Sequence, residues 1–385
     1  MELNQWSVGE VKKQVVKTEG YWIEYSNGEK HIDIQCGNAA YILGYGDEEV
    51  INSIREGQVN FLRGNSGETS YCNEKFIKII CEKGNWAGLG YAVSGSDAVE
   101  SAIAMNDTYW SYKGYDKRKI LSFVPGYHGT TMLGKHLRGE YPYLGRACMV
   151  NGPVWKKVEN QLQAESIALK NVRQKLETDK NIGCLIMETV PWIENVTPYS
   201  TNWWKSIRNI CDEFDILMVL DDVAFCWGKN GAFFGWEPYG VKPDISALGK
   251  SLTGGYSPLG ISTCVKKVYD VISKKSWDHG HTWSPNMSGI YASLKVTEKI
   301  EKLLYKSTYI NDELQKIADE FGLNSRGSNL FRCFDTPKEI SLSALSEAKL
   351  VAAIPSYDRN LKIVAPLIAD EEYFFELKKR MKLLF

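Results

Sequence analysis

The chain has 385 residues, of which 44% are hydrophobic and 24% charged, as in an ordinary globular protein with a buried core. Its 46 basic and 47 acidic residues give a net charge of −1 without a basic domain or charged block, which argues against nucleic acid or an anionic membrane as the main partner. The length predicts two domains, one large and one small.

The N-terminus and the cysteines indicate the compartment. The first residues, MELNQWSVGEVKK, contain no apolar core of a secretory signal, and the apolar run ILMVL (216–220) is far too short to span a bilayer. Nine cysteines, an odd number without a CxxC pair, fit reduced thiols better than a disulfide framework, so we expect a cytoplasmic protein. The five histidines show no His-x-x-x-His or Cys/His clustering, so no metal is expected.

The first predicted element is a β-hairpin over 20–34, with Asn27-Gly28 as the turn between two β-rich runs. After about residue 46, apolar runs that end in Gly, Ser or Asp alternate with helical stretches. The stretch 89–112 predicts a strand, a turn and a helix, and 119–131 predicts a strand and a loop.

Three further apolar runs, at 182–191, 216–224 and 243–250, are nearly continuous, which is typical of central strands in a parallel sheet covered on both faces. A helix is predicted between two of them, over 201–215. The tail from about 290 is helix-rich, contains short strand-like pieces and ends in a helix. The chain is therefore expected to be an α/β layer structure followed by a smaller α+β domain.

Polar and glycine residues follow five of the predicted strands. In such sheets, ligands bind at the carboxyl ends of the strands, so these residues are expected to share one site. They are Ser94-Gly95-Ser96, Tyr127-His128-Gly129, Glu188, Asp221-Asp222 and Lys250.

Lys250 first suggests a P-loop, because Gly249-Lys250-Ser251 matches the end of that motif. The motif requires a glycine at position 244, where this chain has Asp244. A carboxylate there would point at the phosphates that the loop should bind, which disfavours a nucleotide-binding P-loop.

Pyridoxal phosphate (PLP) fits the same residues better. A lysine at the end of a buried strand can form a Schiff base with the cofactor, and Asp221 can keep the pyridine nitrogen protonated. The small residues at 94–96 can face the phosphate at a helix N-terminus. Each signal alone has a plainer reading: Ser94 as a helix N-cap, Asp221 in a structural ion pair, Tyr127 and His128 as packed rings, and Lys250 on the surface.

The chain resembles the class III (fold type I) PLP-dependent aminotransferases. The block LDDVAFCWGKNGAFFGWEPYGVKPDISALGKSLTGGYSPLGIS (220–262) is similar to the family's signature almost end to end. YAVSGSDAVESAI is similar to its phosphate turn, PGYHGTT to its Tyr/Phe-His-Gly element, and DHGHTWSPN (278–286) to its His-Gly-x-Thr element. The N-terminal hairpin and the C-terminal NLKIVAPLIADEEYF also match in order.

The resemblance implies a fold type I architecture, with a mostly parallel seven-stranded sheet in a large domain and a smaller α+β domain. The expected boundaries are 1–45 for an N-terminal segment that joins the small domain, 46–285 for the PLP-binding domain and 286–385 for the small domain. It further implies an aminotransferase that moves an amino group from a donor to a carbonyl acceptor by a ping-pong mechanism.

The resemblance also implies residue roles. Lys250 is the Schiff-base lysine and proton carrier, Asp221 pairs with the pyridine nitrogen, and Val223 and Tyr127 lie on the two ring faces. Thr282 reaches the phosphate of the second subunit, which implies a homodimer with shared active sites. The remaining expected cofactor-binding residues are Ser94, Gly95, Ser96, His128 and Glu188.

Three departures from the family pattern bear on the substrate. Ala224 stands where the family usually has a glutamine that reaches the PLP 3′-oxygen, and Lys362 stands in place of the substrate-carboxylate arginine. Trp192 and Glu194 occupy a usually glycine-rich loop. Alternative carboxylate or phosphate readers are Arg63, Arg138 and Arg332.

Two alternatives to the aminotransferase hypothesis remain open at the level of sequence. An aminomutase of the glutamate-semialdehyde type shares all of these motifs. A non-catalytic protein with the same fold, which binds a ligand or partner, is disfavoured because Lys250 and Asp221 are both intact.

Overall fold

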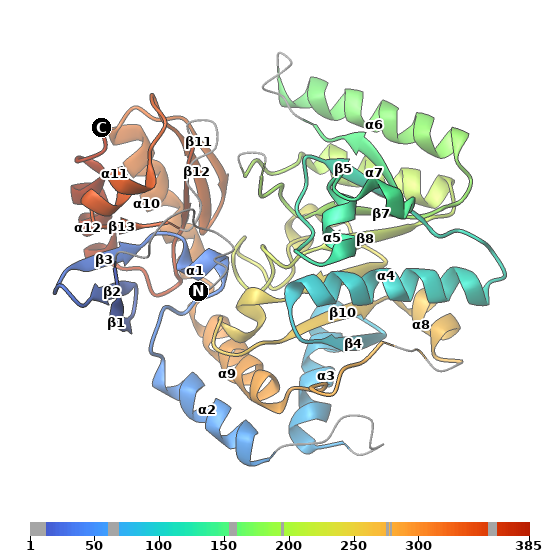
Figure 1. Cartoon of the computed structure of the whole chain (residues 1–385), viewed down its shortest axis with the longest axis horizontal. Helices are drawn as coiled ribbons and strands as arrows, with labels where there is room; N and C mark the ends of the chain where they lie inside the picture. The colour runs from blue at the N-terminus through green and yellow to red at the C-terminus, as the bar shows by residue number, and fades with distance from the viewer. Residues whose placement is uncertain are drawn as a thin grey trace.

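The computed structural model describes residues 13–60, 69–153, 160–193, 196–274, 277, 279–352 and 360–385. Figure 1 shows two lobes: a larger one around a wide central sheet, and a smaller one in which the first strands of the chain lie beside its last elements. None of the helices in these described ranges is long and apolar enough to cross a membrane.

The larger lobe contains a seven-stranded sheet in the order β4-β10-β9-β8-β7-β5-β6. All neighbouring strands are parallel except β10, which runs antiparallel to both β4 and β9. The prediction of a mostly parallel seven-stranded sheet is thereby confirmed. The strands are β4 (Gly88–Ala92), β5 (Lys119–Val124), β6 (Ala147–Asn151), β7 (Ile182–Glu188), β8 (Leu217–Asp221), β9 (Ile245–Leu248) and β10 (Gly260–Cys264).

The central strands are buried on both faces, as their continuous apolar runs predict. Every residue of β7, β8 and β9 is buried. Successive side chains point to opposite faces of a sheet. Accordingly, Leu185 packs in the cluster under α7 with Trp203, whereas Ile186 packs in the cluster under α4 with Val99.

Helices cover both faces of this sheet, and Figure 1 shows α4 on one side and α6 and α7 on the other. The predicted helix at 201–215 forms as α7. The helices and short 3₁₀ turns of this lobe are α4 (Gly95–Tyr112), α5 (Met132–Leu137), η1 (Pro142–Leu144), α6 (Gln161–Thr178), α7 (Thr201–Glu213), η3 (Glu237–Tyr239), η4 (Lys250–Thr253) and α8 (Lys266–Ile272).

The smaller lobe joins the two ends of the chain. The predicted hairpin forms from β2 (Trp22–Tyr25) and β3 (Lys30–Asp33), with Gly28 at a φ of +80° in its turn. β13 (Leu350–Val351) pairs with β3 in parallel, so both ends share one sheet. The other elements are β1 (Val15–Glu19), α1 (Cys36–Ala39), α10 (Lys306–Glu320), β11 (Ser325–Ser328), β12 (Phe331–Asp335), α11 (Leu342–Glu347), β14 (Asn360–Val364) and α12 (Glu371–Met381).

Three further helices, α2 (Glu48–Val59), α3 (Tyr71–Gly84) and α9 (Met287–Leu303), pack together below the sheet in Figure 1. Because α9 packs on α2 and η4 as well as on α3, it lies against the larger lobe. The domain boundaries at residues 45 and 285 stay predictions.

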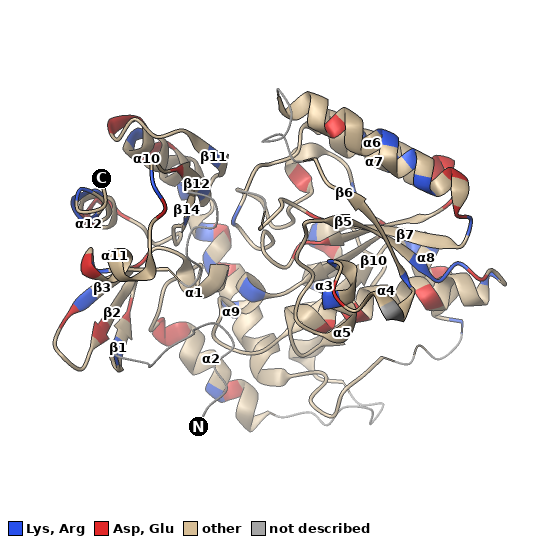
Figure 2. Ribbon diagram, turned by 45° about the horizontal axis from the view of Figure 1, so that its top comes forward, with Lys and Arg blue, Asp and Glu red and all other residues tan. Residues whose placement is uncertain are grey.

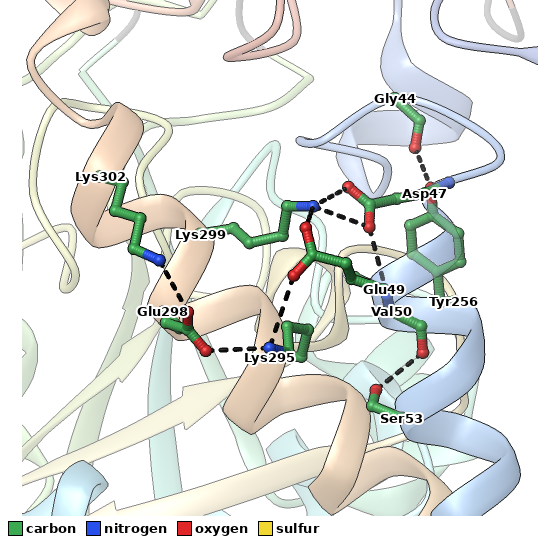
Figure 3. A network of polar contacts seen from close by, with 10 residues as sticks. All are labelled: Gly44, Asp47, Glu49, Val50, Ser53, Tyr256, Lys295, Glu298, Lys299 and Lys302. Carbon is green, nitrogen blue, oxygen red and sulfur yellow. Dashed lines mark hydrogen bonds and ion pairs between the residues drawn. The ribbon is translucent and has the colours of Figure 1, made fainter.

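Charged residues tie α2 to α9 along what we call the α2–α9 seam, which consists of Asp47, Glu49, Lys295, Glu298, Lys299 and Lys302 (Figure 3). Lys299 Nζ lies 2.7 Å from Asp47 and 2.8 Å from Glu49. Elsewhere, Figure 2 shows charged residues mainly on helices and loops, while the strands of the large sheet are mostly uncharged.

Tyr256 connects the seam to the loop that follows β9. Its hydroxyl donates a hydrogen bond to Gly44 O at 2.6 Å and accepts one from the backbone N–H of Asp47 at 2.8 Å. The segment that contains Lys250 is therefore hydrogen-bonded to the N-terminal part of the chain.

Candidate active site

The polar residues at the strand ends line one cavity of about 640 Å³. Its floor is the carboxyl edge of the central strands, where a ligand site is expected. Nine of the ten residues that the sequence predicts line it: Ser94, Gly95, Ser96, Tyr127, His128, Glu188, Asp221, Val223 and Lys250.

Lys250 enters the cavity two residues after β9. It begins η4 with a φ of +47°, in the left-handed region that non-glycine residues rarely adopt. Burial lowers the pKa of its ammonium group, while the nearby Asp221 and Glu188 charges raise it in part. A lysine with a lowered pKa is a better nucleophile, because more of it is the neutral amine.

Three backbone segments approach each other closely beside Lys250. A Cβ added to Gly95 would lie 2.5 Å from Val223 Cγ1, and one added to Gly249 would lie 3.1 Å from Gly95 Cα. A side chain at Gly95 would clash with Val223, and one at Gly249 would press on the Gly95 backbone. The approach places the N-terminus of α4 next to the end of β9.

Asp221 ends β8 and faces His128. Its Oδ2 lies 2.9 Å from His128 Nδ1, and its Oδ1 accepts a hydrogen bond from the Val223 N–H at 3.2 Å. The imidazole is buried, which lowers its pKa, but the hydrogen bond to Asp221 and the carboxylate charge outweigh this and raise it. The pair therefore holds a negative carboxylate at the floor of the cavity.

Glu188 ends β7, the neighbouring strand. Its two oxygens accept hydrogen bonds from the backbone N–H groups of Tyr127 and Trp192, each at 3.0 Å. Burial raises its pKa to about 7, the nearby His128 works against this, and Asp221 adds to it. Glu188 thus fixes the two loops that carry Tyr127 and Trp192.

The turn at Ser94–Ser96 starts α4. Ser94 is the N-cap and accepts a hydrogen bond from the Asp97 N–H at 3.2 Å, so the plainer reading of this serine is correct. The turn also lines the cavity, and the positive end of the helix dipole therefore faces it. Ser96 Oγ accepts a hydrogen bond from Thr130 N at 3.1 Å, which joins the turn to the Tyr127 loop.

Trp192 and its contacts form another part of the cavity lining. Lys250 Nζ and Lys362 Nζ lie 5.1 Å and 5.4 Å from the centre of the indole ring, and Lys362 donates a hydrogen bond to Trp192 O at 2.6 Å. Phe331 packs against the same ring at 4.8 Å between centroids. Both lysines therefore lie near the indole, and Lys362 is also hydrogen-bonded to the backbone of Trp192.

The structure also places the alternative residues. Arg138 lines the cavity and lies over the Tyr127 ring, 5.4 Å from its centre. Arg332 instead bonds to Ser325 and Asn311, and it is absent from the cavity lining that the described residues form. Arg63 and Glu194 lie outside the described residues.

Thr282 is exposed in the loop before α9 and is not among the described residues that line the cavity of its own chain. Its expected role was to reach the second subunit, so it stays a prediction. Ala224, which replaces the usual glutamine, lines the cavity.

Sequence reasoning missed several apolar and loop residues of the cavity. Leu342, at the start of α11, lies far along the chain from the strand ends, and Asn38 lies in α1. No local motif marks either residue. The others are Val99, Val190, Ile193 and Phe225.

These residues fit the expected cofactor. The cavity presents a lysine amine with a lowered pKa, a buried carboxylate and a helix N-terminus along one edge of the sheet. The amine is suited to the aldehyde of PLP, the carboxylate to its pyridine nitrogen, and the helix N-terminus to its phosphate. The close approach of Gly95, Gly249 and Val223 brings the three groups together.

Comparison with known families agrees with this chemistry. The sequence model described as "Aminotransferase class-III" matches residues 5–381. An acetylornithine aminotransferase of Caldanaerobacter subterraneus subsp. tengcongensis is 27% identical over 376 residues, with 93% of this chain and 91% of the relative covered. A putrescine–pyruvate aminotransferase of Pseudomonas aeruginosa is 26% identical over 332 residues, with 79% and 72% covered.

Solved structures show the same fold. An amine transaminase from an uncultivated Pseudomonas species, in its PLP-bound form, superimposes with a TM-score of 0.89. The superposition covers 100% of this chain and 98% of the transaminase chain, and the two sequences are 20% identical. The fold type I architecture expected from sequence is confirmed.

Proposed function

The chain belongs to the class III aminotransferases and is a PLP-dependent aminotransferase, and from this premise we propose that Lys250 is its covalent anchor and catalytic proton carrier. The observation that carries this proposal is that Lys250 and Asp221 line one cavity, with the lysine pKa lowered by burial. The donor and acceptor substrates react in turn at this site, as ping-pong kinetics require.

When bound, PLP supplies an aldehyde that takes up the amine and a ring that accepts electrons from the substrate carbon. Lys250 holds the proton that moves between the reacting carbons, because it is the amine at the floor of the cavity. Trp192, with its ring centre 5.1 Å from Lys250 Nζ, limits where this amine can swing.

Asp221 holds a proton on the cofactor ring nitrogen. His128, hydrogen-bonded to Oδ2, stabilises the carboxylate in its charged form. Val223 and Tyr127 are proposed to enclose the two ring faces. Glu188 positions Tyr127 through its backbone N–H and is not itself required to transfer a proton.

The turn Ser94–Ser96 is proposed to bind the phosphate through backbone N–H groups at the start of α4. Thr282 completes this site from a second copy of the chain, so the active unit is a homodimer. The exposure of Thr282, away from its own cavity, supports this arrangement. Nine unpaired cysteines support a cytoplasmic location.

Transfer between two separate molecules is favoured over an aminomutase reaction within one molecule. The two relatives described above are aminotransferases by name. Incubation with a ¹⁵N-labelled amino donor and an unlabelled carbonyl acceptor distinguishes the two reactions. Label in the acceptor product supports transfer, whereas label confined to an isomer of the donor supports the aminomutase.

The assignment of Lys250 is tested by borohydride reduction of the PLP-loaded protein followed by peptide mass mapping. We expect the added cofactor mass on the peptide that contains Lys250. The Lys250→Ala variant should gain no cofactor mass on any peptide. A reducible adduct on another lysine in that variant would sink the assignment.

A panel of amino donors, followed by the loss of the visible cofactor band, identifies the substrate class. The relatives act on chemically different amines, since putrescine has no carboxylate and acetylornithine has one. Lys362 stands where the family has its substrate-carboxylate arginine, but its ammonium group is hydrogen-bonded to Trp192 O. The experiment therefore decides whether the preferred donor carries a carboxylate.

A further inference from the structure

A cluster of two histidines and one aspartate lies beside the start of α4, outside the residues that line the cavity. His279 and His281 come from the loop before α9, and Asp97 comes from the first turn of α4. One ligand atom from each residue lies within 4.8 Å of the others. The histidine spacing alone predicted no metal, because Asp97 is distant in sequence.

The imidazoles converge on the carboxylate. His279 Nε2 lies 3.3 Å from Asp97 Oδ1, and His281 Nε2 lies 2.7 Å from Asp97 Oδ2. Both Nε2 atoms are shielded from solvent, and neither makes a well-directed hydrogen bond within the described residues. Two ring nitrogens and one carboxylate thus converge closely enough to share an ion.

The loop is held in this position by packing. Trp277 stacks on the His279 ring at 5.7 Å between centroids, and His279 meets the His281 ring at a right angle. Asp97 is fixed as well, because its Oδ2 accepts a hydrogen bond from Val93 N at 2.7 Å. The three ligand groups are therefore oriented before any ion binds.

We propose that Asp97, His279 and His281 bind one divalent ion of the zinc class, which clamps the loop before α9 to α4. Two nitrogen ligands and one carboxylate suit zinc or a related transition metal, whereas calcium and magnesium prefer oxygen ligands. Ligands at about 2.0–2.1 Å in a tetrahedron lie roughly 3.3 Å apart. The His279–Asp97 contact has this length, whereas the 2.7 Å His281–Asp97 contact lengthens when the ion enters. A fourth position stays open for water.

The charge of Asp97 is essential to this site. The first turn of α4 is the positive end of a helix dipole, which repels a cation. The carboxylate offsets this repulsion, and in the described structure its Oδ2 lies 2.7 Å from His281 Nε2. If Thr282 reaches the partner subunit as proposed above, the clamp fixes the residue next to it.

The test is a Co²⁺ titration of the PLP-loaded protein after removal of metals with a chelating resin. We expect one equivalent per chain, a tetrahedral visible spectrum and no thiolate-to-cobalt charge-transfer band. A Zn²⁺ measurement after dialysis should give the same stoichiometry. Thermal unfolding should shift upward with Zn²⁺, because the ion binds the folded state.

Three variants locate the ion. Loss of a residue that only hydrogen-bonds to a metal ligand weakens metal binding roughly 10- to 100-fold. His279→Gln and His281→Gln each remove a ligand itself, so they should weaken Co²⁺ binding by at least this factor. Asp97→Asn should weaken it most, although asparagine can still accept the bond from Val93 N. His31→Gln is the matched control, since His31 also faces a carboxylate, Glu29 at 3.3 Å, but has Lys13 beside it.

The outcomes decide the proposal. Stoichiometric binding that the three variants lose and His31→Gln keeps supports it. Less than one equivalent, equal binding by wild type and His281→Gln, or a thiolate band that places the ion on a cysteine would overturn it. The His281 side chain is 34% exposed, so the His281→Gln variant is expected to fold. Its loss of Co²⁺ binding can therefore be attributed to the missing ligand.

Discussion

Acidic and basic side chains meet both in the cavity and at the α2–α9 seam, but under different conditions. In the cavity, His128 and Asp221 are 1% and 7% exposed, and each has the other as its charged partner at 2.9 Å. At the seam, Lys299 and Glu49 are 21% and 60% exposed, and Lys299 contacts two carboxylates. Burial at the strand ends thus favours a chemical role for the ionisable groups of the cavity. At the seam, exposure to water and shared partners weaken each charge contact, so these groups have a structural role.

The largest effect is expected at the floor of the cavity. Asp221→Asn keeps the size of the side chain but removes the charge that faces His128 and that is proposed to pair with the cofactor ring. We expect kcat to fall by about 100- to 1,000-fold, the range seen when one preorganised electrostatic group is lost. Steady-state kinetics of the PLP-loaded variant measure this, with circular dichroism to confirm folding. A variant with a kcat near wild type would remove Asp221 from the reaction.

The second effect is on the pH dependence of stability. Burial raises the pKa of Asp222 to about 7, although Thr189 and the Gly235 N–H bond to its oxygens and oppose this. Between the ordinary pKa of an aspartate and pH 7, Asp222 is protonated in the folded chain but ionised in the unfolded chain. Stability from this group is therefore present near pH 4 and is lost as the pH rises to 7.

Asp222→Asn should remove that contribution. Urea unfolding between pH 5 and pH 7 measures it, and we expect the wild type to lose up to about 1.4 kcal/mol per pH unit more than the variant. Parallel curves for the two proteins would contradict the raised pKa. Glu188, whose pKa is also raised to about 7, remains in both proteins and cancels in the comparison.

The third effect lies where the two regions join. Tyr256→Phe deletes the hydroxyl that bonds to Gly44 O and the Asp47 N–H. We expect a loss of about 1–3 kcal/mol in the free energy of unfolding, as for a hydrogen-bonded group left without its partner. If kcat also falls, the seam helps to position Lys250; an unchanged kcat would show that the two regions act independently.

The smallest effects are expected within the seam. Lys299→Ala removes contacts to Asp47 and Glu49, while its matched control Lys302→Ala removes one exposed contact to Glu298 at 2.7 Å. Both should cost about 0.2–1 kcal/mol of unfolding free energy, with Lys299→Ala near the upper end, and both costs should shrink in high salt. A larger cost for Lys302→Ala would reverse the expected order.

Local sequence patterns were sufficient to predict the core of the site. Asp221 and Glu188 follow apolar runs, so their places at buried strand ends could be predicted without tertiary information. The turn Ser94–Ser96 and Lys250 were recognisable for the same reason. Strand ends of one parallel sheet meet at one edge, so the convergence of these residues followed from the fold class.

Contacts between distant segments could not be predicted in this way. Leu342 and Asn38 reach the cavity from the smaller lobe. Lys362 donates a hydrogen bond to Trp192 O, although the two residues are 170 positions apart in the sequence. The partnership of His128 with Asp221 also depends on how two loops pack. Each of these requires the relative placement of whole elements, which no short pattern contains.

The antiparallel strand β10 limits how far Lys250 can travel. β9 ends at Leu248, and β10 returns at Gly260 on the same edge, paired with both β9 and β4. The loop between them is anchored at both ends by the sheet and at Tyr256 by two hydrogen bonds. If Lys250 has the two roles proposed above, it changes between them by rotating its side chain, while its backbone stays in place.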